Sequence, residues 1–184
     1  MLSLKNSIIA LALVVSAPMI AAAGELFELE GGIRKVTVGG VETAARTGYA
    51  VGNQVFVVDG PMAPAVEASV GQHLLVKGIV YRRMGIGGET APKLIVGELA
   101  LARVDTSAAT FRVAGCLKSN KVQVQIGSLS FKPAGPLASA LLALDGCEIE
   151  ITGEKNPVAV PAAAESIFIT SIGKRDITKA PAAK

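Results

Sequence analysis

The sequence predicts an all-β protein of two tandem five-stranded Greek-key barrels, with one short helix in each repeat. The composition favours short strands and many turns, because 20 glycines and 9 prolines accompany short runs of valine and isoleucine, and aromatic residues make up only 4%. An internal repeat divides the chain into two similar halves. Both halves show the same order of predicted elements: three strands, a helix and two further strands.

The repeat has a period of 75 residues. This shift places residues 34–78 over 109–153 without a gap, and 11 of the 45 aligned residues are identical. Phe56 matches Phe131, and Pro61 matches Pro136. Glycines, which mark turns and close backbone approaches, are also kept, and we infer a tandem duplication. The matching glycines are Gly40/Gly115, Gly52/Gly127, Gly60/Gly135, Gly71/Gly146 and Gly78/Gly153.

The individual elements follow from the spacing of apolar residues. Valine or isoleucine alternates with glutamine over 122–126, which is typical of a strand with one buried face. Leu137, Leu141 and Leu144 are spaced for one stripe of a short helix after a Gly-Pro turn. The remaining predicted elements rest on Val36 and Val38 (first strand), Phe56 and Phe131 (third), Met62, Val66 and Val70 (first helix), Ile149 and Ile151 (fourth strand), and 94–96 and 167–169 (fifth).

This order of elements is that of the OB-fold, a small five-stranded Greek-key barrel. The pattern Gly-x-x-Leu-x-Val-x-Gly-x-Val starts at Gly71 and is followed by a polar hairpin and a Leu-x-Val strand at Leu94. In this it resembles small exported (periplasmic) bacterial OB-fold proteins. The resemblance implies two OB-like barrels and carries over no functional residues. We expect barrels at 24–105 and 106–177, followed by a disordered tail at 178–184.

The first residues predict export from the cytoplasm. Lys5 precedes an apolar run at 8–15, Pro18 interrupts it, and Ala21-Ala22-Ala23 fits a signal-peptidase site. The apolar stretch is shorter than the roughly 20 residues that span a bilayer. We therefore expect residues 1–23 to be a cleaved signal peptide and the mature chain, with no transmembrane segment, to be periplasmic or extracellular, in a bacterium.

Cys116 and Cys147 are the only two cysteines, and both lie in the predicted mature chain. In an oxidising compartment such a pair predicts a disulfide. Cys116 ends the predicted first strand of the second barrel and Cys147 begins its fourth, and these strands are antiparallel neighbours in an OB-fold. A redox role is disfavoured because the spacing is not C-x-x-C.

The sequence offers few catalytic groups. His73 is the only histidine, and its counterpart in the second copy is Glu148, which indicates an exposed strand position. Glu148 and Glu150 share a strand face and are interpreted as solvated. G-I-G-G-E at 85–89 falls inside a hairpin, so a phosphate-binding loop is not expected. We predict a protein that is not an enzyme, with no cofactor and no metal.

Basic residues cluster where OB-folds bind ligands, at the first and fourth connecting loops. Tyrosines lie beside them, although stacking groups for single-stranded nucleic acid are scarce. The candidate ligand-binding residues of the first barrel are Arg46, Tyr49, Tyr81, Arg82, Arg83 and Lys93.

Two functional hypotheses follow. The first is a non-catalytic exported binding or assembly module, with a protein partner or a homo-oligomer. The second is a binder of an anionic ligand, namely nucleic acid, acidic glycan or lipid headgroup, through the basic loops of the first barrel.

Overall fold

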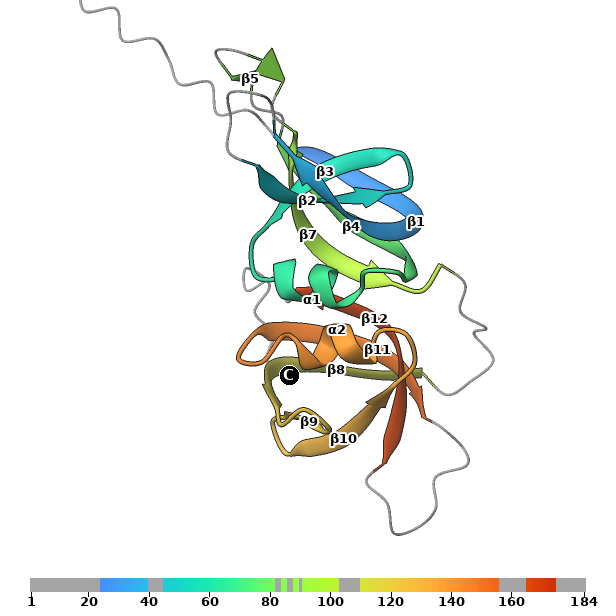
Figure 1. Ribbon diagram of the computed structural model, residues 1–184. Coiled ribbons are helices and arrows are strands. Elements are labelled where there is room, and N and C mark those ends of the chain that lie inside the picture. The colour runs from blue at the N-terminus through green and yellow to red at the C-terminus, as the bar shows by residue number, and fades with distance from the viewer. Residues whose placement is uncertain are drawn as a thin grey trace, which may run out of the picture.

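The computed structural model describes residues 24–39, 45–81, 84–85, 88–89, 91–102, 110–155 and 165–174 (Figure 1). These residues are predominantly β, as predicted, with two short helices. The predicted signal peptide, Arg82, Arg83 and the tail at 178–184 lie outside the described residues. The elements are β1 (Glu25–Val38), β2 (Arg46–Val51), β3 (Gln54–Asp59), α1 (Ala63–Ala68), β4 (His73–Tyr81), β5 (Met84–Gly85), β6 (Gly88–Glu89), β7 (Lys93–Ala100), β8 (Thr110–Ser119), β9 (Val124–Ile126), β10 (Leu129–Ala134), α2 (Ala138–Leu142), β11 (Glu148–Lys155) and β12 (Ser166–Lys174).

Five strands of the first unit, the segment from β1 to β7, pair in a closed circuit. β1 pairs with β2, β2 with β3, β3 with β7, β7 with β4, and β4 with β1. Only the β3–β7 pairing is parallel. The long strand β1 pairs with two strands: its residues 25–32 pair with β4, and its residues 33–38 pair with β2.

The second unit, from β8 to β12, repeats this circuit. β8 pairs with β9, β9 with β10, β10 with β12, β12 with β11, and β11 with β8, and again only one pairing, β10–β12, is parallel. The register of the fourth strand shifts at the same place in both units, between Lys77 and Gly78 and between Thr152 and Gly153. The two halves therefore share one topology down to this irregularity.

The ungapped alignment was wrong for the first strand. Ile33 pairs with Val51 in the first unit, and Leu117 pairs with Ile126 in the second. The second-strand residues differ by the expected 75 positions, but the first-strand residues differ by 84. The hairpin of the first unit is longer, because six residues of β1 pair with β2 whereas three residues of β8 pair with β9, and because the segment 39–45 between its strands is three residues longer than the segment 120–123. Val36 and Val38 lie in the first strand as predicted, but that strand reaches back to Glu25.

The predicted helical stripes are largely confirmed. Met62 and Val66 are buried, and so are the three leucines of the second stripe, Leu137, Leu141 and Leu144. Val70 is exposed because α1 ends at Ala68, and Val122 is exposed because β9 begins only at Val124. Within the described chain, neither helix has the length and apolar character needed to cross a membrane.

The two units are joined by an antiparallel pairing of their fifth strands, β7 and β12. Glu98 pairs with Gly173, Leu99 with Ile172, and Ala100 with Ser171. Since β7 and β12 are equivalent strands, this register relates the units by a local two-fold axis at the central pair. The two helices meet between the units (Figure 1), where the Ser139 hydroxyl donates to the Ala68 carbonyl at 3.2 Å.

One apolar core runs through both units. Strand residues from both circuits and both helices belong to a single cluster of buried side chains, and Leu99 and Ile172 lie within it at the junction. Burying apolar area is the main favourable contribution to folding. The units are therefore expected to unfold together.

The predicted disulfide between Cys116 and Cys147 is absent, and both cysteines are free. Cys116 lies directly opposite Glu148 across the β8–β11 ladder. Directly opposite residues share a sheet face, and consecutive residues alternate between faces. Cys147 therefore points to the face opposite that of Cys116. Cys116 is exposed, whereas Cys147 packs against the core. The prediction placed the two residues on neighbouring strands but missed this alternation: Cys116 lies within β8, and Cys147 directly precedes β11.

Replacing Leu99 with alanine should destabilise the whole protein, because its fully buried side chain fills the junction between the units. We expect a loss of about 2–5 kcal/mol in the free energy of unfolding, measured by urea titration as one cooperative transition. Ile95→Ala, at an exposed position of the same strand, is the matched control and should cost much less. Two separate transitions, only one of them shifted by Leu99→Ala, would show that the units fold independently.

Candidate binding groove

A groove of about 460 Å³ opens at one end of the first unit, where β1, β3 and β7 begin and β4 ends. Its volume falls within the range of small-ligand sites. The lining residues are Glu25, Leu26, Phe27, Gln54, Val55, Phe56, Val80 and Pro92.

Two aromatic rings form the floor of the groove. Phe56 is buried on the inward face of β3, and the partly buried Phe27 of β1 meets it edge to face, with ring centroids 4.7 Å apart. The second unit has the same pair, Phe111 and Phe131, at 5.6 Å. Edge-to-face contact is a preferred geometry for aromatic rings, so the floor is a shared feature of the two units.

The groove rim distinguishes the two units. Equivalent positions follow from the matching strand registers. Lys155 and Glu165 of the second unit form an ion pair at 2.8 Å where the first unit has Val80 and Pro92. The backbone role is unchanged, because the Pro92 and Glu165 carbonyls each accept the equivalent N–H from the third strand. The four apolar rim residues Leu26, Val55, Val80 and Pro92 correspond to Thr110, Ser130, Lys155 and Glu165.

An exposed apolar row continues from the groove across the outer face of the first unit. Leu26, Ile79 and Ile95 are cross-strand neighbours on β1, β4 and β7, and Leu26 is 92% exposed. Gly24 lies against the Ile79 side chain and the Tyr81 ring, so closely that a side chain at position 24 would overlap Ile79.

The structure brings two of the predicted ligand residues, Tyr81 and Lys93, side by side. They are directly opposite each other on β4 and β7, next to the groove residues Val80 and Pro92. Lys93 Nζ contacts an Asp59 carboxylate oxygen at 3.1 Å. This hydrogen bond, with a second one from the Gly60 N–H, lowers the pKa of Asp59.

Of the other predicted ligand residues, Arg46 and Tyr49 do not line the groove. Arg46 is exposed at the start of β2, opposite Val38 of β1. Arg82 and Arg83 are outside the described residues. Tyr49 is buried, with its ring in the core.

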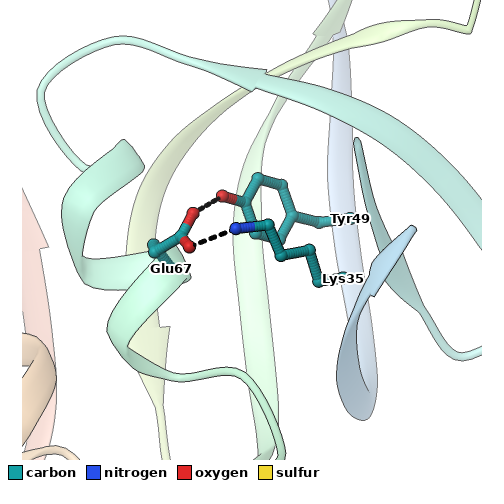
Figure 2. A network of polar contacts seen from close by, with 3 residues as sticks. All are labelled: Lys35, Tyr49 and Glu67. Carbon is teal, nitrogen blue, oxygen red and sulfur yellow. Dashed lines mark hydrogen bonds and ion pairs between the residues drawn. The ribbon is translucent and has the colours of Figure 1, made fainter. Parts of the chain in front are cut away.

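Tyr49 takes part in a polar network that links α1 to the strands (Figure 2). Glu67 of α1 accepts a hydrogen bond from the Tyr49 hydroxyl and another from Lys35 Nζ, the latter at 2.6 Å. Burial of the ring, and then the bond and charge of Glu67, raise the pKa of Tyr49 to about 12. The hydrogen bonds from Lys35 and Tyr49 lower the pKa of Glu67. The Tyr49 hydroxyl therefore contributes to positioning α1.

Sequence reasoning missed Phe27, Val80 and Pro92 as site residues. Phe27 aligns with Phe111 only after the longer β1–β2 hairpin is allowed for, and this alignment was the one available signal. Val80 and Pro92 have no chemical signature of their own. They matter because strand pairing brings them to the same end of the unit.

His73, the only histidine of the sequence, forms an exposed ion pair on the outer face of the first unit. His73 Nε2 lies 3.1 Å from a Glu30 carboxylate oxygen, and both side chains are more than half exposed. In the described parts of the chain, no three histidine, cysteine, aspartate or glutamate residues come together in a way that could hold a metal ion.

The raised pKa of Tyr49 predicts a loss of stability at alkaline pH. Below pH 10 the tyrosine is protonated in both the folded and the unfolded chain, so it contributes no pH dependence. Between pH 10 and about pH 12 the unfolded chain ionises first, so the free energy of unfolding falls. Urea titrations across this window should show a smaller fall for Tyr49→Phe than for the wild type. Tyr81→Phe, which leaves the Glu67 contact intact, is the matched control. An equal fall in the wild type and Tyr49→Phe would contradict the assignment.

Comparisons with protein-family models, with curated proteins and with solved structures found no match. We therefore compared the first unit with the second, which has the same order of strand pairings. At equivalent positions, the two units share the aromatic floor and differ in the rim of the groove.

Proposed function

We propose that this chain is an exported, non-catalytic binding module of two OB-like barrels, in which the first barrel holds an apolar group and the second serves as a scaffold. The circuit of strand pairings supports OB-like barrels, since the order is 1-2-3-5-4-1 with the third and fifth strands parallel and a helix before the fourth. Greek-key barrels of this kind commonly bind ligands on an open face or at a mouth.

The observation that carries this proposal is the difference between the two rims. Both units have the same backbone pairing and the same pair of phenylalanines, but only the first has valine and proline where the second has the Lys155–Glu165 ion pair. Placing an apolar group against charged residues costs desolvation energy, whereas contact with Val80, Pro92 and the rings gains apolar burial. The first groove is therefore suited to an apolar group.

The charge distribution near the groove supports an apolar rather than an anionic ligand. Lys93 contacts Asp59, and Lys35 contacts Glu67, so each of these cations already has a carboxylate partner. An anion-binding role for Arg46, Arg82 and Arg83 stays a separate prediction.

A binding role is also supported by where the reactive side chains lie. His73 pairs with Glu30, and Arg112 pairs with Glu150, on the outer faces of strands. These pairs do not line the groove, whose side chains apart from Glu25 are apolar or amide groups, which bind rather than transfer protons or attack a substrate.

Transferring the charged rim of the second unit to the first should remove binding. The Val80→Lys/Pro92→Glu variant recreates the ion pair at the groove, and we expect its affinity for a neutral apolar fluorophore such as Nile red to fall about tenfold or more. Fluorescence titration of the mature protein measures the effect. Lys155→Val/Glu165→Pro in the second unit is the matched control and should leave the first groove unaffected. Equal affinity of the wild type and the Val80→Lys/Pro92→Glu variant would refute the proposed site.

Export predicts a defined amino terminus. When the full chain is produced in a bacterium, the protein recovered outside the cytoplasm should begin at Gly24, as measured by intact mass and amino-terminal sequencing. Replacing Ala21 and Ala23 with bulky residues should leave the precursor uncleaved. Full-length chain accumulating in the cytoplasm of the wild type would contradict export.

A further inference from the structure

One edge of β1 has no strand partner in the described part of the chain. Residues 25–32 pair with β4 on one side, whereas β2 pairs only with residues 33–38. The β2–β3 turn contacts the strand at Gly31, where an added Cβ would lie 2.6 Å from the Gly52 nitrogen. Beyond that contact, Glu25, Leu26 and Phe27 form one wall of the groove.

The backbone groups of this edge are set by the pairing on the other side. Ile33 exchanges hydrogen bonds with residues 71 and 72, just before β4. In an antiparallel ladder, alternate residues direct their N–H and C=O groups to opposite edges. The backbone N–H and C=O groups of Ile33 and of the odd-numbered residues before it therefore form hydrogen bonds with β4. The backbone groups of Leu26, Glu28 and Glu30 point to the opposite, open edge. Such an edge is a template for an added strand.

The side chains along the edge define which strand would fit. Leu26, Glu28 and Glu30 are exposed on the outer face, so a strand beside them would place basic residues opposite the two carboxylates. The intervening residues of that strand would share the inner face with Phe27, towards the groove and Val80. The surface therefore complements an extended segment in which apolar and basic residues alternate.

We propose that the ligand of the groove is an extended polypeptide segment that adds antiparallel to the open edge of β1, with its apolar side chains in the groove and its basic side chains opposite Glu28 and Glu30. This inference rests on the proposed binding function and specifies its ligand. Main-chain hydrogen bonds supply affinity in strand addition, and pockets for alternate side chains supply selectivity.

The test uses the mature protein and a labelled, end-blocked heptapeptide in which lysine and valine alternate. Fluorescence anisotropy should show saturable binding. Methylating the amide nitrogens of the lysines, which face β1 in this arrangement, should weaken binding about tenfold or more. The matched control carries the same number of methyl groups on the valine amides, which face away from β1, and should bind nearly as well as the parent peptide.

Charge reversal tests the outer face independently. Glu28→Lys should weaken binding of the lysine peptide about fivefold and favour a peptide with glutamate in place of lysine. Glu154→Lys, the same charge reversal on β11 of the second unit, is the control variant and should leave binding unchanged. Identical affinities for the two methylated peptides, or no preference reversal in Glu28→Lys, would overturn the strand-addition proposal.

The outcomes separate this inference from the proposed function. Nile red binding that depends on Val80 and Pro92, without any peptide binding, leaves the binding function standing and overturns the peptide ligand. Concentration-dependent dimers that Glu28→Lys dissociates would identify a second copy as the occupant and also overturn it. Loss of both Nile red and peptide binding would refute the groove itself.

Discussion

The antiparallel pairing of β7 with β12 is the contact on which the rest of the molecule depends. It sets Leu99 opposite Ile172, and both side chains are fully buried there, so the cores of the two units become one. A small barrel of this length would bury limited apolar area by itself. Joining two of them along equivalent strands raises the buried area of each and places the helices against one another.

This arrangement allows the two units to differ in role. The second unit has a charged pair, Lys155 and Glu165, across the end at which the first unit has its groove. An exposed ion pair adds little stability, and it places charges where the first unit has apolar side chains. The first unit keeps valine and proline there and exposes Leu26 beside them. Both halves contribute to the common core, whereas the proposed binding surface belongs to the first.

The order of elements could be predicted from the sequence because its signals are local. Gly71 and Gly146 have positive φ and turn the chain shortly after the two helices, and the leucine stripe of the second helix is buried as its spacing indicates. Val36 and Val38 do lie in the first strand, but its start at Glu25 was missed because the longer β1–β2 hairpin carries no local signal. The ungapped alignment therefore hid the equivalence of Phe27 and Phe111.

The candidate site was harder to predict for a physical reason. Its residues come from the ends of four strands, and only the pairing registers bring them together. Charge and aromatic character drew attention to the neighbouring Tyr81 and Lys93, which do lie side by side. Tyr49 was predicted to bind a ligand for the same reason as Tyr81, namely an aromatic ring close to basic residues in the sequence. Its hydroxyl is instead bonded to Glu67, which a different element supplies.

The close approach of Gly24 to Ile79 and Tyr81 has a consequence for how the amino terminus is made. A signal peptidase inspects mainly the small residues before the cut and tolerates many residues after it. The folded protein is less tolerant, because any side chain at position 24 would overlap Ile79. If the predicted signal peptide is cleaved after Ala23, the packing of Ile79 on β4 would then favour glycine as the first residue of the mature protein. The new α-amino group would then lie beside Ile79, in the exposed apolar row of Leu26, Ile79 and Ile95.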